Sequence, residues 1–272
     1  MFTIDKSKCV NCGICAADCP VKIIRMDEGQ KCPVPAEKAQ ELCINCGHCV
    51  AACPEGAFSL ETMPVEKCWE LPESWKISRR QTEDLLKGRR SIRVYKKDKA
   101  DKADLEKIID ICRYAPSGIN LQPVRWLVVY DSAKVRELAG LTIEMARQMV
   151  KDNSPMAQFL HLDGLVSAWD NGEDRICRGA PHLVIAYALK DDATAPAAAT
   201  IALAYFELAA LSFGLGTCWG GYLNMALNTY EPARAALGIS KRCVFHGALM
   251  AGFPEFQHRR IPLRNDPHIK WK

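Results

Sequence analysis

The sequence predicts an α+β protein of two domains: a small cysteine-rich domain, followed by a larger domain of mixed helices and strands. Ten of the fourteen cysteines lie between Cys9 and Cys68. The rest of the chain alternates between helical and strand-like hydrophobic patterns. A length of 272 residues suits one or two domains, at roughly 100–200 residues each.

The composition is that of a globular protein. With 49% hydrophobic and 25% charged residues, the chain is neither disordered nor collagen-like. Its net charge of +4 is too small to indicate nucleic-acid binding. No apolar signal segment precedes Cys9, so we expect a cytoplasmic protein that does not enter a membrane. In a reducing compartment, cysteines in this number indicate metal binding rather than disulfides.

The first 60 residues contain an internal repeat. The segment CVNCGICAADCP at 9–20 recurs as CINCGHCVAACP at 43–54, with eight of twelve positions identical and an offset of 34 residues. Each copy runs into a short apolar stretch, Ile23-Ile24 and Ala57-Phe58. Duplication of one half-domain, covering 1–62, accounts for this pattern.

Three cysteines separated by two residues can surround three irons of one cube, and the proline after the fourth redirects the chain. This spacing resembles that of bacterial ferredoxins with two 4Fe-4S clusters. Zinc sites use two well-separated CxxC pairs and fit it poorly. We interpret two further cysteines, Cys32 and Cys68, as structural or incidental. The resemblance implies crossed ligation, with one cluster held by Cys9, Cys12, Cys15 and Cys53 and the other by Cys43, Cys46, Cys49 and Cys19.

Residues 63–80 carry prolines and scattered charge and are interpreted as a linker to a domain at 81–272. Helical spacing occurs at 103–113, 135–150 and 197–213, and apolar runs typical of strands at 126–130, 183–189 and 244–251. The uncharged window between Glu207 and Glu231 is long enough for a membrane helix. Because it holds several glycines, we interpret it as a buried helix that runs into a glycine-rich turn.

Three guanidinium groups surround a hydroxyl in Arg89-Arg90-Ser91-Ile92-Arg93. Forked donors of this kind suit a phosphate, although an isolated run is more typical of a solvated basic face. The chain has no Walker motif and no GxGxxG after a strand, so neither a P-loop nor a Rossmann site is indicated.

The segment 89–95, the loop APSGINLQP at 115–123, and GFP at 252–254 followed by RIP at 260–262 together resemble the nitroreductase family of FMN enzymes. The resemblance covers 81–272 and implies an FMN-binding α/β sandwich, an intertwined homodimer and two flavins at its interface. One departure is that Val124 and Arg125 separate the Gln-Pro pair from Trp126. The residues implied to bind FMN are Arg89, Arg90, Ser91, Arg93 and Arg260 at the phosphate, ribityl chain and ring edge, Pro116, Ser117 and Asn120 along the flavin, and Trp219, Gly220 and Gly221 against its ring.

The segment 155–174 falls where such enzymes carry a lid. Its Met156, Phe159 and Trp169 either contact substrate or pack in the core. The Glu-Tyr-Lys lid set of the related iodotyrosine deiodinases is missing, which argues against dehalogenation. No histidine lies at triad or metal spacing, so no side chain is given a catalytic role and the flavin supplies the chemistry.

We therefore expect electrons to pass through two 4Fe-4S clusters to FMN, which reduces a nitro compound, quinone or activated alkene. Residues 1–68 carry a net charge of −2 and the remainder +6, which is consistent with an acidic electron-transfer domain beside a basic one. Ferredoxin or NAD(P)H is the expected donor. Two alternatives stay open: an NAD(P)H-oxidising enzyme that uses the clusters as an outlet, and a non-enzymatic electron carrier or redox sensor.

Overall fold

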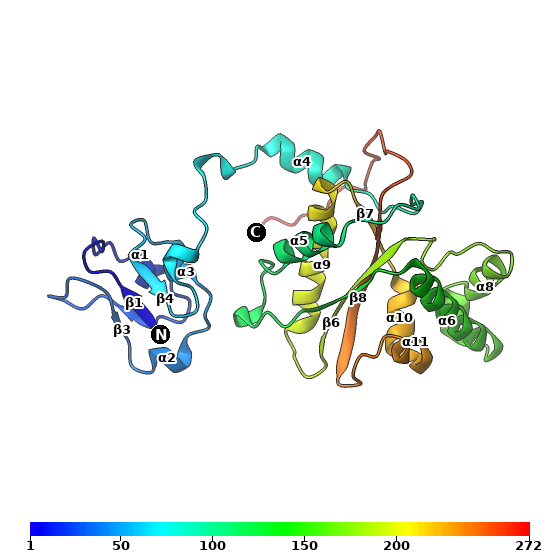
Figure 1. Cartoon of the computed structure of the whole chain (residues 1–272), viewed down its shortest axis with the longest axis horizontal. Helices are drawn as coiled ribbons and strands as arrows, with labels where there is room; N and C mark the ends of the chain where they lie inside the picture. The colour runs from blue at the N-terminus through cyan, green and yellow to red at the C-terminus, as the bar shows by residue number, and fades with distance from the viewer. The chain divides into compact units, whose positions relative to one another are not determined.

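The computed structural model describes residues 1–272, which divide into two compact units (Figure 1). The first unit comprises Met1–Ile77 together with Gly118–Leu121, and the second comprises Ser78–Ser117 and Gln122–Lys272. Each unit has its own hydrophobic core. The α+β class predicted from the sequence is confirmed.

The N-terminal unit consists of short elements around a small core. Strand β1 pairs antiparallel with β4, and β2 with β3. Ile23, Ile24, Val50, Phe58 and Leu60 are buried between these pairs and the helices. The elements are β1 (Phe2–Ile4), α1 (Ile14–Asp18), β2 (Ile24–Arg25), β3 (Val34–Pro35), α2 (Ala39–Leu42), α3 (His48–Ala51), β4 (Phe58–Leu60) and the 3-10 turns η1 (Val65–Lys67) and η2 (Glu73–Trp75).

The sequence repeat reappears in the backbone. Left-handed φ angles recur at an offset of 34 residues, at Asn11 and Asn45 and at Lys22 and Gly56. Helices α1 and α3 start at the same offset and pack on each other. The two halves are therefore two copies of one fold.

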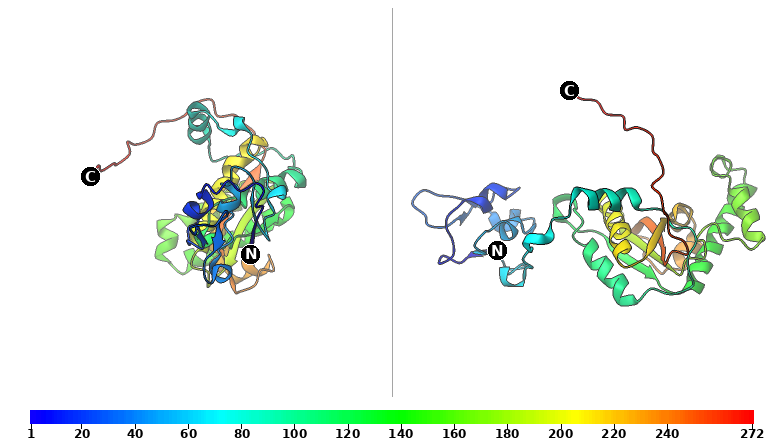
Figure 2. Two further views of the ribbon diagram at one scale, coloured as in Figure 1. Left: turned by 90° about the vertical axis from the view of Figure 1, so that its left-hand side faces the viewer. Right: turned by 90° about the horizontal axis from the view of Figure 1, so that it is seen from above.

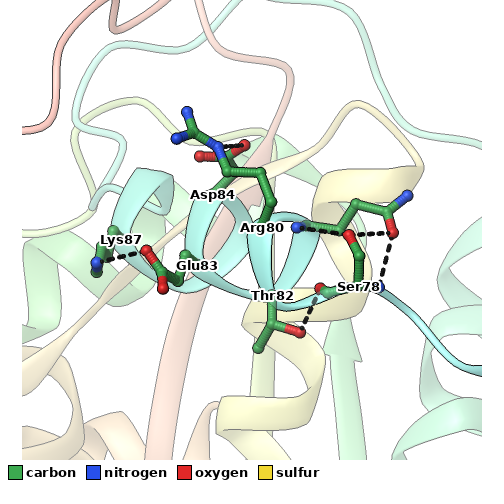
Figure 3. A network of polar contacts seen from close by, with 7 residues as sticks. Ser78, Arg80, Thr82, Glu83, Asp84 and Lys87 are labelled. Carbon is green, nitrogen blue, oxygen red and sulfur yellow. Dashed lines mark hydrogen bonds and ion pairs between the residues drawn. The ribbon is translucent and has the colours of Figure 1, made fainter.

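Helix α4 (Arg79–Gly88) opens the C-terminal unit, two residues before the predicted start of this domain at 81. Its start is fixed by a capping box, in which Ser78 Oγ accepts from the Gln81 N–H at 3.2 Å and Gln81 Oε1 accepts from the Ser78 N–H at 2.9 Å. Figure 3 shows this cap with the Thr82 hydroxyl bond to the Ser78 carbonyl and two ion pairs along the helix, Arg80–Asp84 and Lys87–Glu83.

The C-terminal unit is built on an antiparallel sheet in the order β5-β6-β8-β7. The two long central strands are β6 (His182–Leu189) and β8 (Cys243–Gly252), and the edges are β5 (Arg125–Val129) and β7 (Gly216–Trp219). The chain pairs Val184 with Leu249 at the centre of the sheet.

Helices cover both faces of this sheet (Figure 1). Alternate residues of β6 face opposite layers, so Leu183 and Ile185 join one core cluster while Val184 and Ala186 join the other. The helices are α6 (Ser132–Lys151), α10 (Gly221–Thr229) and α11 (Glu231–Ala235) on the first face, and α5 (Lys102–Cys112) and α9 (Ala195–Ser212) on the second. The result is the predicted α/β sandwich.

Each predicted helix and strand of this unit is present within three residues of its expected bounds. Helices α5, α6 and α9 and strands β5, β6 and β8 match the six predicted segments. The predicted glycine-rich turn at 214–221 is only partly correct, because this stretch forms strand β7 and the start of α10. Strand β7 needs a glycine at 216 because Ile92 packs against it there and leaves no room for a side chain.

Helix α9 passes the length and composition test for a membrane-crossing helix, with a mean hydropathy of 1.4 over 18 residues. In the folded chain it packs on the sheet and on α5, and Leu203 and Phe206 are fully buried. It is therefore a core helix of the sandwich. Its outward side keeps an apolar stripe at helical spacing, in which Ile201 is 36% and Tyr205 38% exposed.

Residues 255–272 form an exposed tail with no helix or strand. Figure 2 shows this tail running away from the sheet of its own unit. It leaves the fold after an isolated β-bridge between Tyr95 and Pro254 and a hydrogen bond from the Glu255 N–H to the Val94 carbonyl at 3.1 Å.

Candidate functional site

The eight cysteines of the repeat line two separate cavities in the N-terminal unit. Each cavity takes three cysteines from one copy of the repeat and the fourth from the other copy. This is the crossed grouping that the ferredoxin resemblance implies. A cavity of about 370 Å³ is lined by Cys9, Cys12, Cys15 and Cys53, and one of about 360 Å³ by Cys19, Cys43, Cys46 and Cys49.

Two left-handed glycines place the cysteines around these cavities. Gly13 and Gly47 have φ angles of 76° and 75° and directly precede α1 and α3. Glycine adopts this conformation without steric cost. At Gly47 a Cβ atom would also lie 2.8 Å from the sulfur of Met63. The chain can therefore turn sharply between the second and third cysteine of each copy.

The cysteine cavities suit a metal cluster chemically. Thiolates are the soft ligands that iron–sulfur clusters use. Burial raises the pKa of Cys15, and it raises the pKa of Cys49 to about 12. These thiols are therefore neutral without metal and release their protons when a metal binds.

The two remaining cysteines of this unit do not line either cavity. Cys68 is exposed, and its thiol donates to the Pro64 carbonyl at 3.5 Å. Cys32 lies beside Cys9: burial and a hydrogen bond with the Cys9 thiol raise the pKa of Cys32.

In the C-terminal unit, the arginine-rich segment 89–93 runs along the β7 edge of the sheet. The Ile92 N–H donates to the Thr217 carbonyl at 2.8 Å, and the Ile92 side chain is buried. This anchor separates the neighbouring side chains, since Arg90 and Arg93 line different cavities. Ser91, between them, is half-buried.

Arg89 reaches a buried carboxylate that the sequence reasoning missed. Glu207 lies on the apolar helix α9 and is 7% exposed. Its Oε1 accepts from Arg89 Nη1 at 3.3 Å and from the Thr217 hydroxyl at 3.1 Å, and its Oε2 accepts from the Trp219 indole N–H at 2.7 Å. Glu207 therefore joins the arginine-rich segment to the end of β7. A single acidic residue in an otherwise apolar helix was the available signal.

Strand β7 ends at the predicted Trp219-Gly220-Gly221 turn. The Gly220 N–H donates to the Ala248 carbonyl at 2.8 Å, and α10 begins at the next residue. A Cβ atom on Gly221 would meet nothing within 4 Å. The turn thus presents open backbone and the positive end of a nine-residue helix, which together favour an electron-rich group.

A cavity of about 400 Å³ opens at this turn, within the C-terminal unit. The predicted residues Arg93, Trp219, Gly220 and Gly221 line it. Two arginines that the sequence reasoning missed, Arg175 and Arg178, line it as well. Its size and its mixture of apolar walls and few polar groups are typical of small-molecule sites.

The other predicted flavin residues lie at the opposite edge of the sheet. Pro116 and Ser117 precede β5, whereas Trp219 ends β7, three strands away. At about 4.8 Å per strand, roughly 14 Å separate the two edges. Ser117 Oγ accepts from the Gln122 N–H at 3.0 Å. Asn120 groups with the first unit, where its amide donates to the carbonyls of Ile44 and Asn45.

The predicted phosphate ligand Arg260 lies on the exposed tail. It makes no hydrogen bond or ion pair with the 89–93 segment. A single chain therefore gathers Arg93 and the Trp219–Gly221 turn, but it does not gather Pro116, Ser117, Asn120 or Arg260 around the same cavity.

The predicted lid forms two helices, α7 (Pro155–Phe159) and α8 (Leu162–Asp170). Met156 and Phe159 are exposed, at 48% and 79%. Trp169 packs on Gly140 and under Arg136, so the core alternative holds for this residue. Leu160, between the two helices, lines the cavity instead.

Comparisons with known proteins agree with both halves of this description. The sequence model of the nitroreductase family matches residues 86–253, and that of the 4Fe-4S dicluster domain matches residues 8–58. A relative from Thermus thermophilus named NADH dehydrogenase is 28% identical over 190 residues, 64% of this chain and 89% of the relative. An iodotyrosine deiodinase from Thermotoga neapolitana is 28% identical over 134 residues, 49% of this chain and 70% of its own.

A crystal structure of a nitroreductase with bound FMN from Desulfitobacterium hafniense shares the fold. It superposes with a TM-score of 0.56 at 20% identity, covering 72% of this chain and all of that one. The chain therefore belongs to the nitroreductase family, as an FMN-dependent oxidoreductase with an N-terminal 4Fe-4S dicluster ferredoxin domain.

Proposed function

We propose that the two clusters carry electrons to the FMN, which passes a pair of them to a small nitro compound, quinone or activated alkene. The proposal rests on one observation: two complete four-cysteine cavities and a flavin-binding domain occur in the same chain. Thiolate ligation requires a reducing compartment, so we place the protein in the cytoplasm.

The crossed cysteine sets are the proposed cluster ligands. One set is Cys9, Cys12, Cys15 and Cys53, and the other is Cys43, Cys46, Cys49 and Cys19. Their support is the position of each set around its own cavity.

For the flavin, the chain offers charge on one side and open backbone on the other. Arg93 supplies forked donors to the ring edge, and the backbone N–H groups at Gly220-Gly221 and the α10 N-terminus donate to the ring's electron-rich atoms. Arg90 and Ser91 bind the phosphate and ribityl chain. Arg89 contributes through its pairing with Glu207.

A second copy of the chain completes this site in our proposal. Residues Pro116 and Ser117 lie at the wrong edge of the sheet to reach the cavity at Trp219 in their own chain. A partner could bring its own loop, and its Arg260, to that cavity. The exposed apolar stripe on α9, with Ile201 and Tyr205, is the surface we assign to the dimer contact.

A charge within this stripe should separate the dimer. We expect Ile201→Glu to give a monomer that has lost most of its FMN, because a buried unpaired carboxylate strongly disfavours an interface. Analytical ultracentrifugation measures the mass, and the flavin absorbance measures the content. Ala235→Glu, at an exposed alanine on α11, should leave both unchanged. An Ile201→Glu dimer with full flavin would contradict the assignment.

The direction of electron flow can be measured by anaerobic reduction of the bound flavin. We expect reduced ferredoxin to bleach the flavin band rapidly and NADH or NADPH to do so slowly, because the clusters are the entry route. Full-length protein is used with each donor in turn. Rapid bleaching by a nicotinamide and none by ferredoxin would reject the inward route.

That contrary result would favour a second candidate function. The Thermus relative carries the name NADH dehydrogenase and aligns with 64% of this chain. In this alternative, NAD(P)H reduces the flavin directly and the clusters pass electrons outward to a protein acceptor.

A further inference from the structure

The flavin cavity carries more positive charge than the flavin motif supplies. Three arginines line it, namely Arg93, Arg175 and Arg178, and no aspartate or glutamate does. Only Arg93 belongs to the family motif. Arg175 and Arg178 lie in the loop between α8 and β6, which follows the predicted lid in the sequence.

A single aspartate, Asp174, holds the backbone of this loop. Asp174 accepts three backbone hydrogen bonds, from the N–H groups of Ile176, Cys177 and Gly179 at 2.9, 2.9 and 3.1 Å. Ile176 and Cys177 are buried beneath the loop. The backbone at Arg175 and Arg178 is therefore held in place before any ligand arrives.

Arg178 has an unusual conformation and no partner. Its φ angle is +57°, in the left-handed region that non-glycine residues rarely adopt. Such strain is concentrated at functional sites. Arg175 pairs with Glu173 at 2.6 Å, whereas the half-buried Arg178 guanidinium makes no hydrogen bond or ion pair. Arg93 makes none either, so Arg178 and Arg93 are the two unpaired cations of the cavity, and Arg178 is the one that lies outside the flavin motif.

Arg178 and Arg93 both lie near the largely buried Tyr95. Burial raises the pKa of Tyr95 far above its usual range, and both Arg178 and Arg93 oppose that rise. Apolar and aromatic side chains, among them Met225, Met250 and Tyr222, line the same cavity. A planar ring can pack there while a charged substituent reaches the arginine.

We propose that Arg178 binds the carboxylate of an anionic, conjugated acceptor and so makes this enzyme selective for acidic substrates. The inference rests on the proposed function, since it names the substrate class of the same flavin cavity. A charge-assisted pair with a forked guanidinium is the chemistry that would recognise such a group.

The test is equilibrium binding to the oxidised, FMN-loaded full chain, followed by the change in flavin absorbance. The probes are 4-nitrobenzoate and 4-nitrobenzamide, which share a ring and a nitro group and differ in charge. We expect the benzoate to bind about tenfold more tightly, as a hydrogen bond to a charged group implies. In Arg178→Gln the preference should disappear, with FMN content unchanged.

Two further variants control for charge and for loop packing. Arg242→Gln removes an exposed arginine just before β8, about 26 Å along the strand from Met250, and should keep the tenfold preference. Arg178→Lys restores the charge and should recover a preference of several-fold. If it recovers none, the glutamine effect comes from the loop and the proposal is wrong.

Other outcomes also reject the proposal. Equal binding of both probes, or no binding of either, removes the acidic site. If the preference for the benzoate survives in Arg178→Gln, another residue causes that preference. If this variant loses FMN, Arg178 is a flavin ligand. This binding test involves no turnover, so it does not depend on the reaction. If a separate activity assay shows that the protein binds the benzoate but never reduces it, that result overturns the proposed function and leaves the binding proposal standing.

Discussion

Replacing Cys19 with alanine is expected to remove the cluster opposite its own motif and to lower bound iron from about eight to about four atoms per chain. Cys19 lines the cavity of Cys43, Cys46 and Cys49. Alanine removes the donor atom, whereas the hydroxyl of serine could still bind iron. Iron analysis and the cluster absorbance measure the loss. Flavin bleaching by reduced ferredoxin should slow sharply.

Two double variants distinguish crossed from uncrossed ligation. With crossed ligation, Cys19→Ala combined with Cys46→Ala damages only one cluster and leaves about four irons. Cys19→Ala combined with Cys15→Ala damages both and leaves almost none. Uncrossed ligation predicts the reverse order. Cys68→Ala, at an exposed cysteine outside both cavities, is the control and should keep full iron.

Replacing Glu207 with leucine is expected to lower the free energy of unfolding of the C-terminal unit by about 2–3 kcal/mol. The buried Thr217 hydroxyl and the Trp219 indole N–H would lose their acceptor, and Arg89 would lose its counter-ion. Since Trp219 precedes the Gly220-Gly221 turn, FMN should also bind more weakly. Urea unfolding followed by tryptophan fluorescence, and titration of the apoprotein with FMN, measure the two effects.

A glutamine at the same position separates shape from charge. Glu207→Gln keeps an oxygen that can accept from Trp219 and Thr217 but removes the charge that pairs with Arg89. We expect it to recover most of the stability and only part of the FMN affinity. If Glu207→Leu unfolds at the urea concentration of the wild type, the carboxylate does not hold these elements together.

The sequence predicted the parts of the fold whose hydrophobic period is long and regular. Helices α5, α6 and α9 and strands β5, β6 and β8 each repeat their pattern over several turns or alternations. Strand β7 has four residues and starts at a glycine, so it has no alternation to detect. Its pairing with β8, over Gly216 to Trp219, depends on residues thirty or more positions away.

Site residues divide in the same way. The cysteine spacing is local, and it predicted both cavity sets. Arg93 and Trp219 were found because each lies in a recognisable motif. Glu207, Arg175 and Arg178 lie in no motif. The role of Glu207 arises from its tertiary contacts with β7, and that of the two arginines from their position at the cavity. The lone acidic residue in an apolar helix was a signal for Glu207 but did not identify its partners, and a single sequence gives no such signal for the two arginines.

The contact between Gly216 and Ile92 links the mutational histories of two distant segments. A Cβ atom on Gly216 would lie 2.2 Å from Cγ1 and 3.0 Å from Cβ of Ile92. Alanine at 216 therefore requires a smaller residue at 92, and neither change is favourable alone. Ile92 stands between Arg90 and Arg93. A substitution in strand β7 that displaces Ile92 therefore also displaces these two guanidinium groups. Divergent descendants of this chain must change both sites together or keep both.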